Sequence, residues 1–208
     1  MKPFALIAVL LLFVASPLSA ETVAISSKLR VHFEVPPGWV SNPDPPQFLV
    51  DEMAEHIEHD AAQKGRHPSR DQLQKAARAR FESNEALLFN PHSHAFMSLD
   101  FSPLSQGERA PSDKTIKLSA RYAAESLGQE EGVTELTTQP SKVAVAGAWY
   151  AQRFDARYKH HDKPMAFTGI VGFVSPYWFY FYYTDYLENR QDRESAEKIL
   201  QSIRIEKR

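Results

Sequence analysis

Apolar and polar residues alternate along a stretch that begins just after the first twenty residues. Val23 and Ile25, followed by 29–35, place an apolar side chain at every second position, which predicts two β-strands or one bent strand. The Pro-Pro-Gly segment at 36–38 ends this pattern with a turn, and Trp39 is expected to fold back onto the core. The pattern therefore predicts sheet structure at the start of the folded chain.

Helical spacing follows at four places. Apolar side chains recur every three or four residues over 50–61, 73–81, 116–127 and 196–203. Gly65 ends the first helix, and Ser69 with Gln72 forms a capping box that opens the second, so these two are expected to form a helical hairpin. Gly128 closes the third helix, and Asp192 is expected to cap the fourth.

Strand patterns occupy most of the remaining chain, at 85–90, 95–101, 143–158, 165–174, 178–183 and 204–206. The long pair in the second half is joined by a polar turn at 159–164, which is typical of an antiparallel hairpin. Trp178–Tyr183 is aromatic on both faces and is expected to be a central strand covered on both sides. This order of strands and helices predicts an α+β domain in which helices pack on an antiparallel sheet.

The first twenty residues have the three parts of a secretory signal. Lys2 supplies the positive end, Phe4–Val14 is an unbroken apolar run, and Ser16–Ala20 is a short polar region that ends in alanine. A membrane-spanning helix needs about 20 apolar residues, and this run stops at Pro17. We therefore expect residues 1–20 to be a cleaved signal peptide and 21–208 to form one exported domain, either periplasmic or secreted.

Composition narrows the class of protein further. The chain has no cysteine, which excludes both a lipid-modified cysteine at the cleavage site and disulfide bonds. The 188 residues after position 20 carry 23 basic and 26 acidic side chains, since only Lys2 is removed, and their net charge is −3. This balance argues against nucleic-acid binding, and no second apolar run predicts a membrane span after cleavage. The expected product is soluble, with a stability that depends on a packed core.

Short sequences near both ends of the domain resemble PsbP-like proteins. One is a strand that runs into proline and Gly-Trp, Phe33-Glu34-Val35-Pro36-Pro37-Gly38-Trp39. The other is a closing helix that runs into a strand, Ala196-Glu197-Lys198-Ile199-Leu200-Gln201-Ser202-Ile203-Arg204-Ile205. Between them, Val145-Ala146-Gly147-Ala148 and the long hairpin after it fit the same pattern. That family shares its fold with the Mog-type Ran-binding factor and with periplasmic proteins similar to DcrB.

The resemblance implies an α/β/α sandwich around an antiparallel sheet, and a binding or accessory module more than an enzyme. It assigns no site residues, because proteins of one fold bind unrelated partners. Residues 48–83 are longer and more helical than the family pattern leads us to expect. The helical hairpin, 50–83, is therefore interpreted as an insertion and as a place for a function particular to this chain.

Six of the eight histidines come in pairs. His56 and His59 are expected on the polar face of the first helix together with Glu52, since successive residues turn by ~100° around a helix. Two imidazoles and a carboxylate one turn apart suit a divalent ion such as Zn or Cu, and a solvated polar face is the alternative. The pairs at 92/94 and 160/161 fall in predicted turns. The sequence leaves open whether two pairs meet in space.

The aromatic block near the end of the chain is the other candidate site. Tyr177, Trp178, Tyr180 and Tyr182 are predicted to form a partner surface, because dense aromatic side chains can line a hydrophobic groove for a peptide or a helix. A role in the core is the alternative. No Gly-x-Ser-x-Gly elbow and no cysteine nucleophile is present. No catalytic or cofactor-binding residue is therefore assigned.

Together these patterns predict a non-enzymatic exported binding or accessory module that acts on a protein or peptide partner in the cell envelope or outside the cell. The alternative is a periplasmic divalent-metal-binding protein that uses paired histidines. A third hypothesis, an enzyme, would need two facing carboxylates or a Ser/His pair in a buried cleft. Neither the partner nor the oligomeric state can be inferred from the residues alone.

Overall fold

The computed structural model describes residues 19–42, 44–82 and 84–208, so most of the predicted signal peptide lies outside the described chain. The strands are β1 (Ser19–Ser26), β2 (Leu29–Val35), β3 (Val40–Ser41), β4 (Ala86–Phe89), β5 (Phe96–Pro103), β6 (Val133–Lys142), β7 (Tyr150–His160), β8 (Lys163–Val174), β9 (Tyr177–Tyr186) and β10 (Arg204–Lys207). The helices are α1 (Gln47–Gln63), α2 (Arg70–Phe81), α3 (Asp113–Ser126) and α4 (Arg190–Ser202), with a short 3-10 turn, η1 (Leu127–Gln129). No helix in these ranges is long and apolar enough to cross a membrane.

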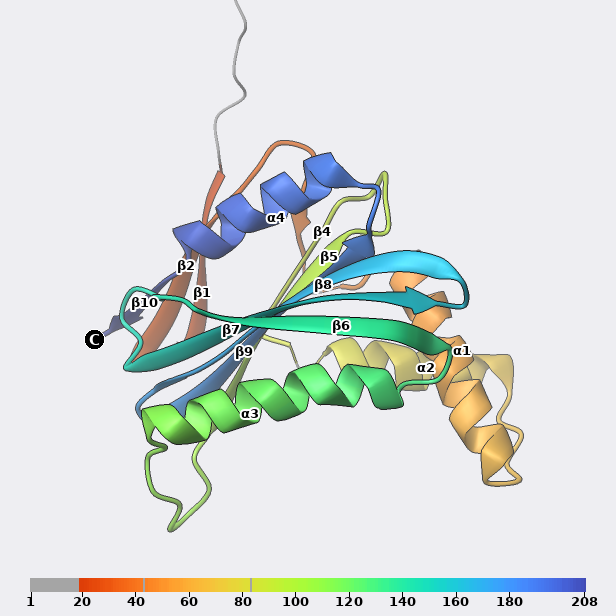
Figure 1. The fold of residues 1–208 in the computed structure, drawn as a ribbon, viewed down its shortest axis with the longest axis horizontal. Coiled ribbons are helices and arrows are strands. Elements are labelled where there is room, and N and C mark those ends of the chain that lie inside the picture. Colours follow the sequence, from red (N-terminus) through yellow and green to blue (C-terminus); the bar gives the residue numbers. More distant parts are fainter. Residues whose placement is uncertain (1–18, 43, 83) are drawn as a thin grey trace, which may run out of the picture.

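Two antiparallel sheets organise the described chain, with the strand orders β1-β2-β10 and β3-β4-β5-β9-β8-β7-β6. Helix α4 and the small sheet lie on one face of the large sheet, the α4 face, and α3 lies on the opposite face, the α3 face (Figure 1). Helices α1 and α2 form the predicted helical hairpin, which packs through Leu49 and Phe81 on Leu87 and Phe89 of β4. The predicted α+β fold, an antiparallel sheet flanked by helices, is confirmed.

The main core lies between the α4 face of the large sheet and the layer made by α4 and the small sheet. Phe179 and Phe181 of β9 are fully buried, and they share one cluster with Val31 and Phe33 of β2 and with Ile199 of α4. Strand β9 pairs with β5 on one side and β8 on the other. The aromatic strand is therefore central, as its two-sided pattern predicts.

Two glycines of β8 leave room for aromatic rings. A Cβ at Gly169 would lie 2.3 Å from Phe154, and a Cβ at Gly172 would lie 2.1 Å from Phe179. The pairing of β8 with β7 and with β9 is regular at both glycines. Their role is therefore close packing and not a β-bulge.

Strand β6 is absent from the sequence-based prediction. It forms one border of the large sheet and pairs only with β7 among the described strands. Its side chains are exposed on both faces for most of its length, so the strand lacks the alternation of apolar and polar residues that marks a half-buried strand.

The predicted long strand over 143–158 begins seven residues late, at Tyr150. Val145 is buried in the main core, but the chain turns at Gly147, whose φ is +86°. A Cβ at Gly147 would lie 1.9 Å from the carbonyl oxygen of Ile205. The apolar run at 143–148 therefore forms a packed loop beside β10 and not the start of β7.

The predicted cap of the last helix is also wrong. Helix α4 begins at Arg190 and its N-cap is Asn189. Asp192 lies inside the first turn, is buried, and accepts a hydrogen bond of 2.7 Å from the side-chain amide of Asn90. Its carboxylate therefore fixes the turn before β5 to the helix instead of capping α4.

Candidate functional site

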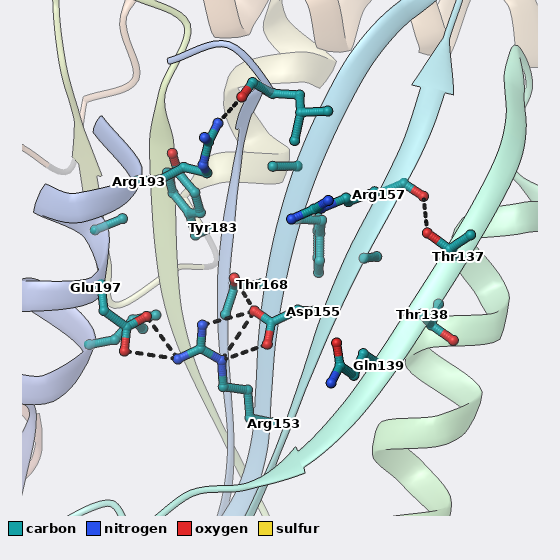
Figure 2. Close-up of a pocket in the computed structure, with 16 residues that line it drawn as sticks. Thr137, Thr138, Gln139, Arg153, Asp155, Arg157, Thr168, Tyr183, Arg193 and Glu197 are labelled. Carbon is teal, nitrogen blue, oxygen red and sulfur yellow. Dashed lines mark hydrogen bonds and ion pairs between the residues drawn. The ribbon is translucent and has the colours of Figure 1, made fainter. Parts of the chain in front are cut away.

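A polar groove with a volume of about 690 Å³ lies between α4 and the part of the α4 face that strands β6, β7 and β8 form (Figure 2). The layer made by α4 and the small sheet covers β5 and β9. The large sheet continues past α4 and ends at border strand β6. The groove is lined by Thr137, Thr138, Gln139, Arg153, Asp155, Ala156, Arg157, Ala166, Phe167, Thr168, Tyr183, Leu187, Arg193, Ala196, Glu197 and Leu200. We call it the polar groove below.

Arg153 organises the floor of the polar groove. Its Nε and Nη2 donate to the carboxylate of Asp155 at 2.8–3.1 Å, and its Nη1 donates to both oxygens of Glu197 at 2.8 and 3.0 Å. Asp155 also accepts a bond of 2.7 Å from the hydroxyl of Thr168. Burial by itself lowers the pKa of Arg153, but these hydrogen bonds and charges outweigh it and raise that pKa. The network ties β7 and β8 to α4 and holds the floor in one arrangement.

Two further arginines give the polar groove an excess of positive charge. Arg193 of α4 donates to the carbonyl of Leu187. Arg157 of β7 is exposed, and within the described residues its guanidinium has no hydrogen-bond or ion-pair partner. Figure 2 shows the Arg157 side chain reaching across the sheet toward Tyr183. Three arginines against the two carboxylates of Asp155 and Glu197 leave a net charge of +1, which suits a ligand that carries a carboxylate.

The predicted aromatic surface is divided between two faces of the large sheet. Tyr177 packs against the main core, whereas Trp178, Tyr180 and Tyr182 lie on the α3 face. Successive rings in that trio stack with centroids 6.3 Å apart. The three rings are half-buried and belong to the cluster beneath α3. A role as a partner surface stays a prediction for this trio.

A pair of carboxyl groups lies beside the aromatic trio and was not predicted. Asp100 of β5 stands opposite Tyr180 in the strand register, and burial raises its pKa to about 7, with the nearby charge of Glu85 as the second cause. Burial also raises the pKa of Glu85, which accepts a hydrogen bond of 2.7 Å from the amide of Phe101. When the side-chain nitrogen of Asn84 faces Asp100, it donates hydrogen bonds of 2.5 and 3.2 Å to the two carboxylate oxygens of Asp100. The only sequence signal was the polar alternation Ser98, Asp100, Ser102 within an apolar strand.

The three predicted metal ligands contact different partners. Glu52 accepts a bond of 3.1 Å from His94 Nδ1, and His59 Nε2 lies 2.7 Å from Glu131. His56 stacks on His160, with ring centroids 5.6 Å apart. In the described part of the chain no three His, Asp or Glu side chains are arranged to hold a metal ion. The fold does, however, bring the histidine pair of α1 next to the pair at the β7–β8 turn.

The two-sheet arrangement, with α4 on one face and α3 on the other, defines a PsbP-like fold. The solution structure of cyanobacterial PsbP (CyanoP) from Synechocystis matches this chain with a TM-score of 0.51 and 11% identity, over 96% of this chain and 98% of that one. At this identity the likeness shows the fold alone. The resemblance to PsbP-like proteins inferred from the sequence is thereby confirmed for the fold.

Two other solved structures match less well. LpqN, involved in cell envelope biogenesis of Mycobacterium tuberculosis, has a TM-score of 0.49 and 13% identity, over 92% of each chain. The Ran-binding protein Mog1p of Saccharomyces cerevisiae has a TM-score of 0.43 and 11% identity, over 88% of this chain and 86% of that one. No protein-family model and no curated protein matches the sequence.

Proposed function

We propose that this protein is a non-enzymatic binding module that holds a carboxylate-bearing segment of a partner protein in the polar groove. The observation that carries the proposal is Arg157, an exposed guanidinium without a partner in the described chain, set above a floor that Arg153 holds fixed. A planar guanidinium pairs with a carboxylate through two parallel hydrogen bonds. The groove volume of about 690 Å³ is within the usual range for ligand sites.

The polar lining also favours a protein or peptide segment over an apolar ligand. Thr137, Thr138 and Gln139 of β6 are exposed along the border of the sheet, where they can donate and accept hydrogen bonds from an extended chain. The secretory signal predicted for residues 1–20 supports a site of action in the cell envelope or outside the cell. The partner in this proposal is therefore an envelope or extracellular protein with an exposed acidic segment or carboxyl end.

Photo-crosslinking tests the proposal directly. A photoreactive residue at Gln139, which is exposed in the polar groove, should crosslink one partner in an envelope extract of the source cells. Arg157→Glu should lower the yield about 10-fold, as expected when one charged contact worth ~1.4 kcal/mol is lost. Arg204→Glu, a matched reversal on exposed β10, should leave the yield unchanged. Equal yields in the two variants, or no crosslinked product with the unmodified groove, would reject the proposal.

Divalent-metal binding is the second candidate that we propose. The stacking of His56 on His160 supports it, because this contact brings two histidine pairs into one region. Rotation of both rings is required, since stacked imidazoles do not direct their nitrogen atoms at one ion. Calorimetry with zinc and with copper should show binding that a His56→Ala, His59→Ala variant loses. Unchanged binding in that variant would remove these ligands.

A further inference from the structure

A second groove lies on the α3 face, between α3 and strands β6 and β7, and has a volume of about 740 Å³. Its floor is apolar, because it is formed by Ala120, Ala124 and Phe154, which are each less than 5% exposed. Alanines occupy the two α3 positions that face the sheet here, and their short side chains leave the space between helix and sheet unfilled. We call this space the apolar groove.

The walls of the apolar groove also suit an apolar ligand. Leu118 of α3 remains 39% exposed at its rim, and Pro140 of β6 lines the opposite side. The one buried polar side chain in the lining, Gln152, already donates to the carbonyl of Ser141 at 2.5 Å. Among the described lining residues, the floor therefore contains no buried polar group that lacks a hydrogen-bond partner, and an apolar ligand would leave none unsatisfied.

Positive charge gathers along the rim of the apolar groove. Its lining contains four basic side chains, Lys114, Lys117, Arg121 and Lys142, and one acidic side chain, Glu125. Lys117 pairs with Asp113, and Arg121 pairs with Glu125. Lys114 and Lys142 have no ion-pair or hydrogen-bond partner within the described residues. Two cations are thus free to bind a ligand anion.

The topology places these two free lysines at the same end of the groove. Strand β6 follows α3 through η1 and runs back in the opposite direction, so the first turn of α3 and the last residues of β6 lie at the same end of the two elements (Figure 1). Lys114 is in that first turn, and Lys142 is the last residue of β6. An anionic head group at this end would leave an attached apolar chain lying along Ala120 and Ala124.

We propose that the apolar groove binds the long-chain carboxylate of a fatty acid. Its carboxylate lies between Lys114 and Lys142, and its hydrocarbon chain covers Phe154 and the two alanines of α3. Charge complementarity selects this occupant over an uncharged or cationic amphiphile, because two of the four basic groups in the lining are unpaired within the described residues, whereas its one acidic group, Glu125, is paired with Arg121. The proposal is independent of the polar groove, which lies on the opposite face of the same strands.

Displacement of a fluorescent fatty acid from the purified protein tests this assignment. Dodecanoate should displace the probe at least 10-fold more effectively than dodecanol, and dodecyltrimethylammonium should be weaker than both. A Lys114→Glu, Lys142→Glu variant should lose this preference for dodecanoate. A matched Lys198→Glu variant, which changes an exposed residue of α4, should keep it. Lys114 and Lys142 are both exposed, so the charge reversals should not affect folding.

Three results of the displacement assay overturn the assignment. They are the absence of displacement by dodecanoate, equal displacement by the cationic amphiphile, and an unchanged preference in the double variant. A fourth is concentration-dependent dimerisation that competes with the probe, because it would make a second copy of the chain the occupant. Ala124→Leu, which places a larger side chain in the groove, should weaken both dodecanoate and dodecanol while circular dichroism stays unchanged. If it alters neither affinity, the groove is not the site.

Discussion

Asp100 is a carboxyl group whose protonation changes near neutral pH. Burial raises its pKa from 3.8 to about 7, so the folded state holds the proton more tightly than the unfolded state does. The contribution of Asp100 to stability is therefore greatest at low pH and falls as the pH rises from 3.8 toward 7. Asp100→Asn should therefore raise the free energy of unfolding by ~1 kcal/mol at pH ~8. This value is smaller than the full pKa shift implies, because solvent screens the carboxylate and the Asn84 amide donates hydrogen bonds to it. Urea unfolding measures this difference.

The same pair of carboxyl groups provides the control. At pH ~3, below the ordinary value of 3.8, Asp100 is protonated in both the folded and the unfolded chain, so the Asp100→Asn variant and the parent should have nearly equal stability there. Glu85→Gln removes the second cause of the raised pKa, and it should move the pH dependence of Asp100 to lower pH. A difference between Asp100→Asn and the parent that does not depend on pH would contradict this account.

The polar groove shows what residue patterns reveal and what they conceal. Arg153, Asp155 and Arg157 occupy alternate positions in a strand that the sequence predicts, so their common face was visible in the pattern. Glu197, which completes the bonds of Arg153, lies 44 residues further along the chain. No local period reports a contact of that separation. The site therefore depends on a long-range contact between α4 and β7, which the residue pattern does not predict.

At the scale of elements, the contact between α1 and the β7–β8 turn is built from titratable rings. His56 stacks on His160, whose ring centroid is also 4.5 Å from that of His161. Burial lowers the pKa of His160, with further lowering by His161, His56 and Lys163 and a smaller opposing effect of Glu131. The stabilising contribution of His160 is thus fully present above its ordinary pKa of 6.5 and is lost as the pH falls below that value.

Acidification should therefore loosen this contact. Backbone amides over 159–163 should exchange with solvent faster at pH ~5.5 than at pH ~7.5, after correction for the intrinsic exchange rate, because protonated imidazoles repel one another. His160→Gln should remove most of the pH-dependent part. His67→Gln, a matched change at an exposed residue of the α1–α2 loop, should retain it. Equal pH dependence in the two variants would show that the ring stack does not control the contact.

The helices and strands that the sequence predicts correctly are those with one strongly buried face. Helices α1, α2 and α3 and strands β2 and β9 have buried faces, and their periodicity matches the structure. The capping box of Ser69 and Gln72 is present as predicted. Border strand β6 has no buried face, and its pattern gave no signal. The separation of β1, β2 and β10 into a sheet of their own depends on long-range pairing, which periodicity does not encode.

At the scale of the whole molecule, the helical hairpin is tied to the large sheet by its own apolar cluster. Leu49 of α1 is 2% exposed and packs with Phe81, Leu87 and Phe89. A second cluster, which includes Val50, Leu73 and Ala77, joins α1 to α2. Met53 packs against both clusters. This continuous packing predicts that the hairpin and the sheet unfold together, although residues 50–83 are interpreted as an insertion.

Leu49→Ala should therefore lower the free energy of unfolding by about 2–4 kcal/mol, the usual cost of a cavity at a buried leucine. Circular dichroism follows the helices, whereas fluorescence follows Trp39, Trp149 and Trp178, which all lie outside the hairpin. The two signals should report one coincident transition in urea. Leu73 packs in the cluster that joins α1 to α2, which contains no strand residue. If the hairpin and the sheet unfold together, Leu73→Ala should shift the fluorescence transition as well. If helix signal is lost before fluorescence changes, the hairpin is an independent unit.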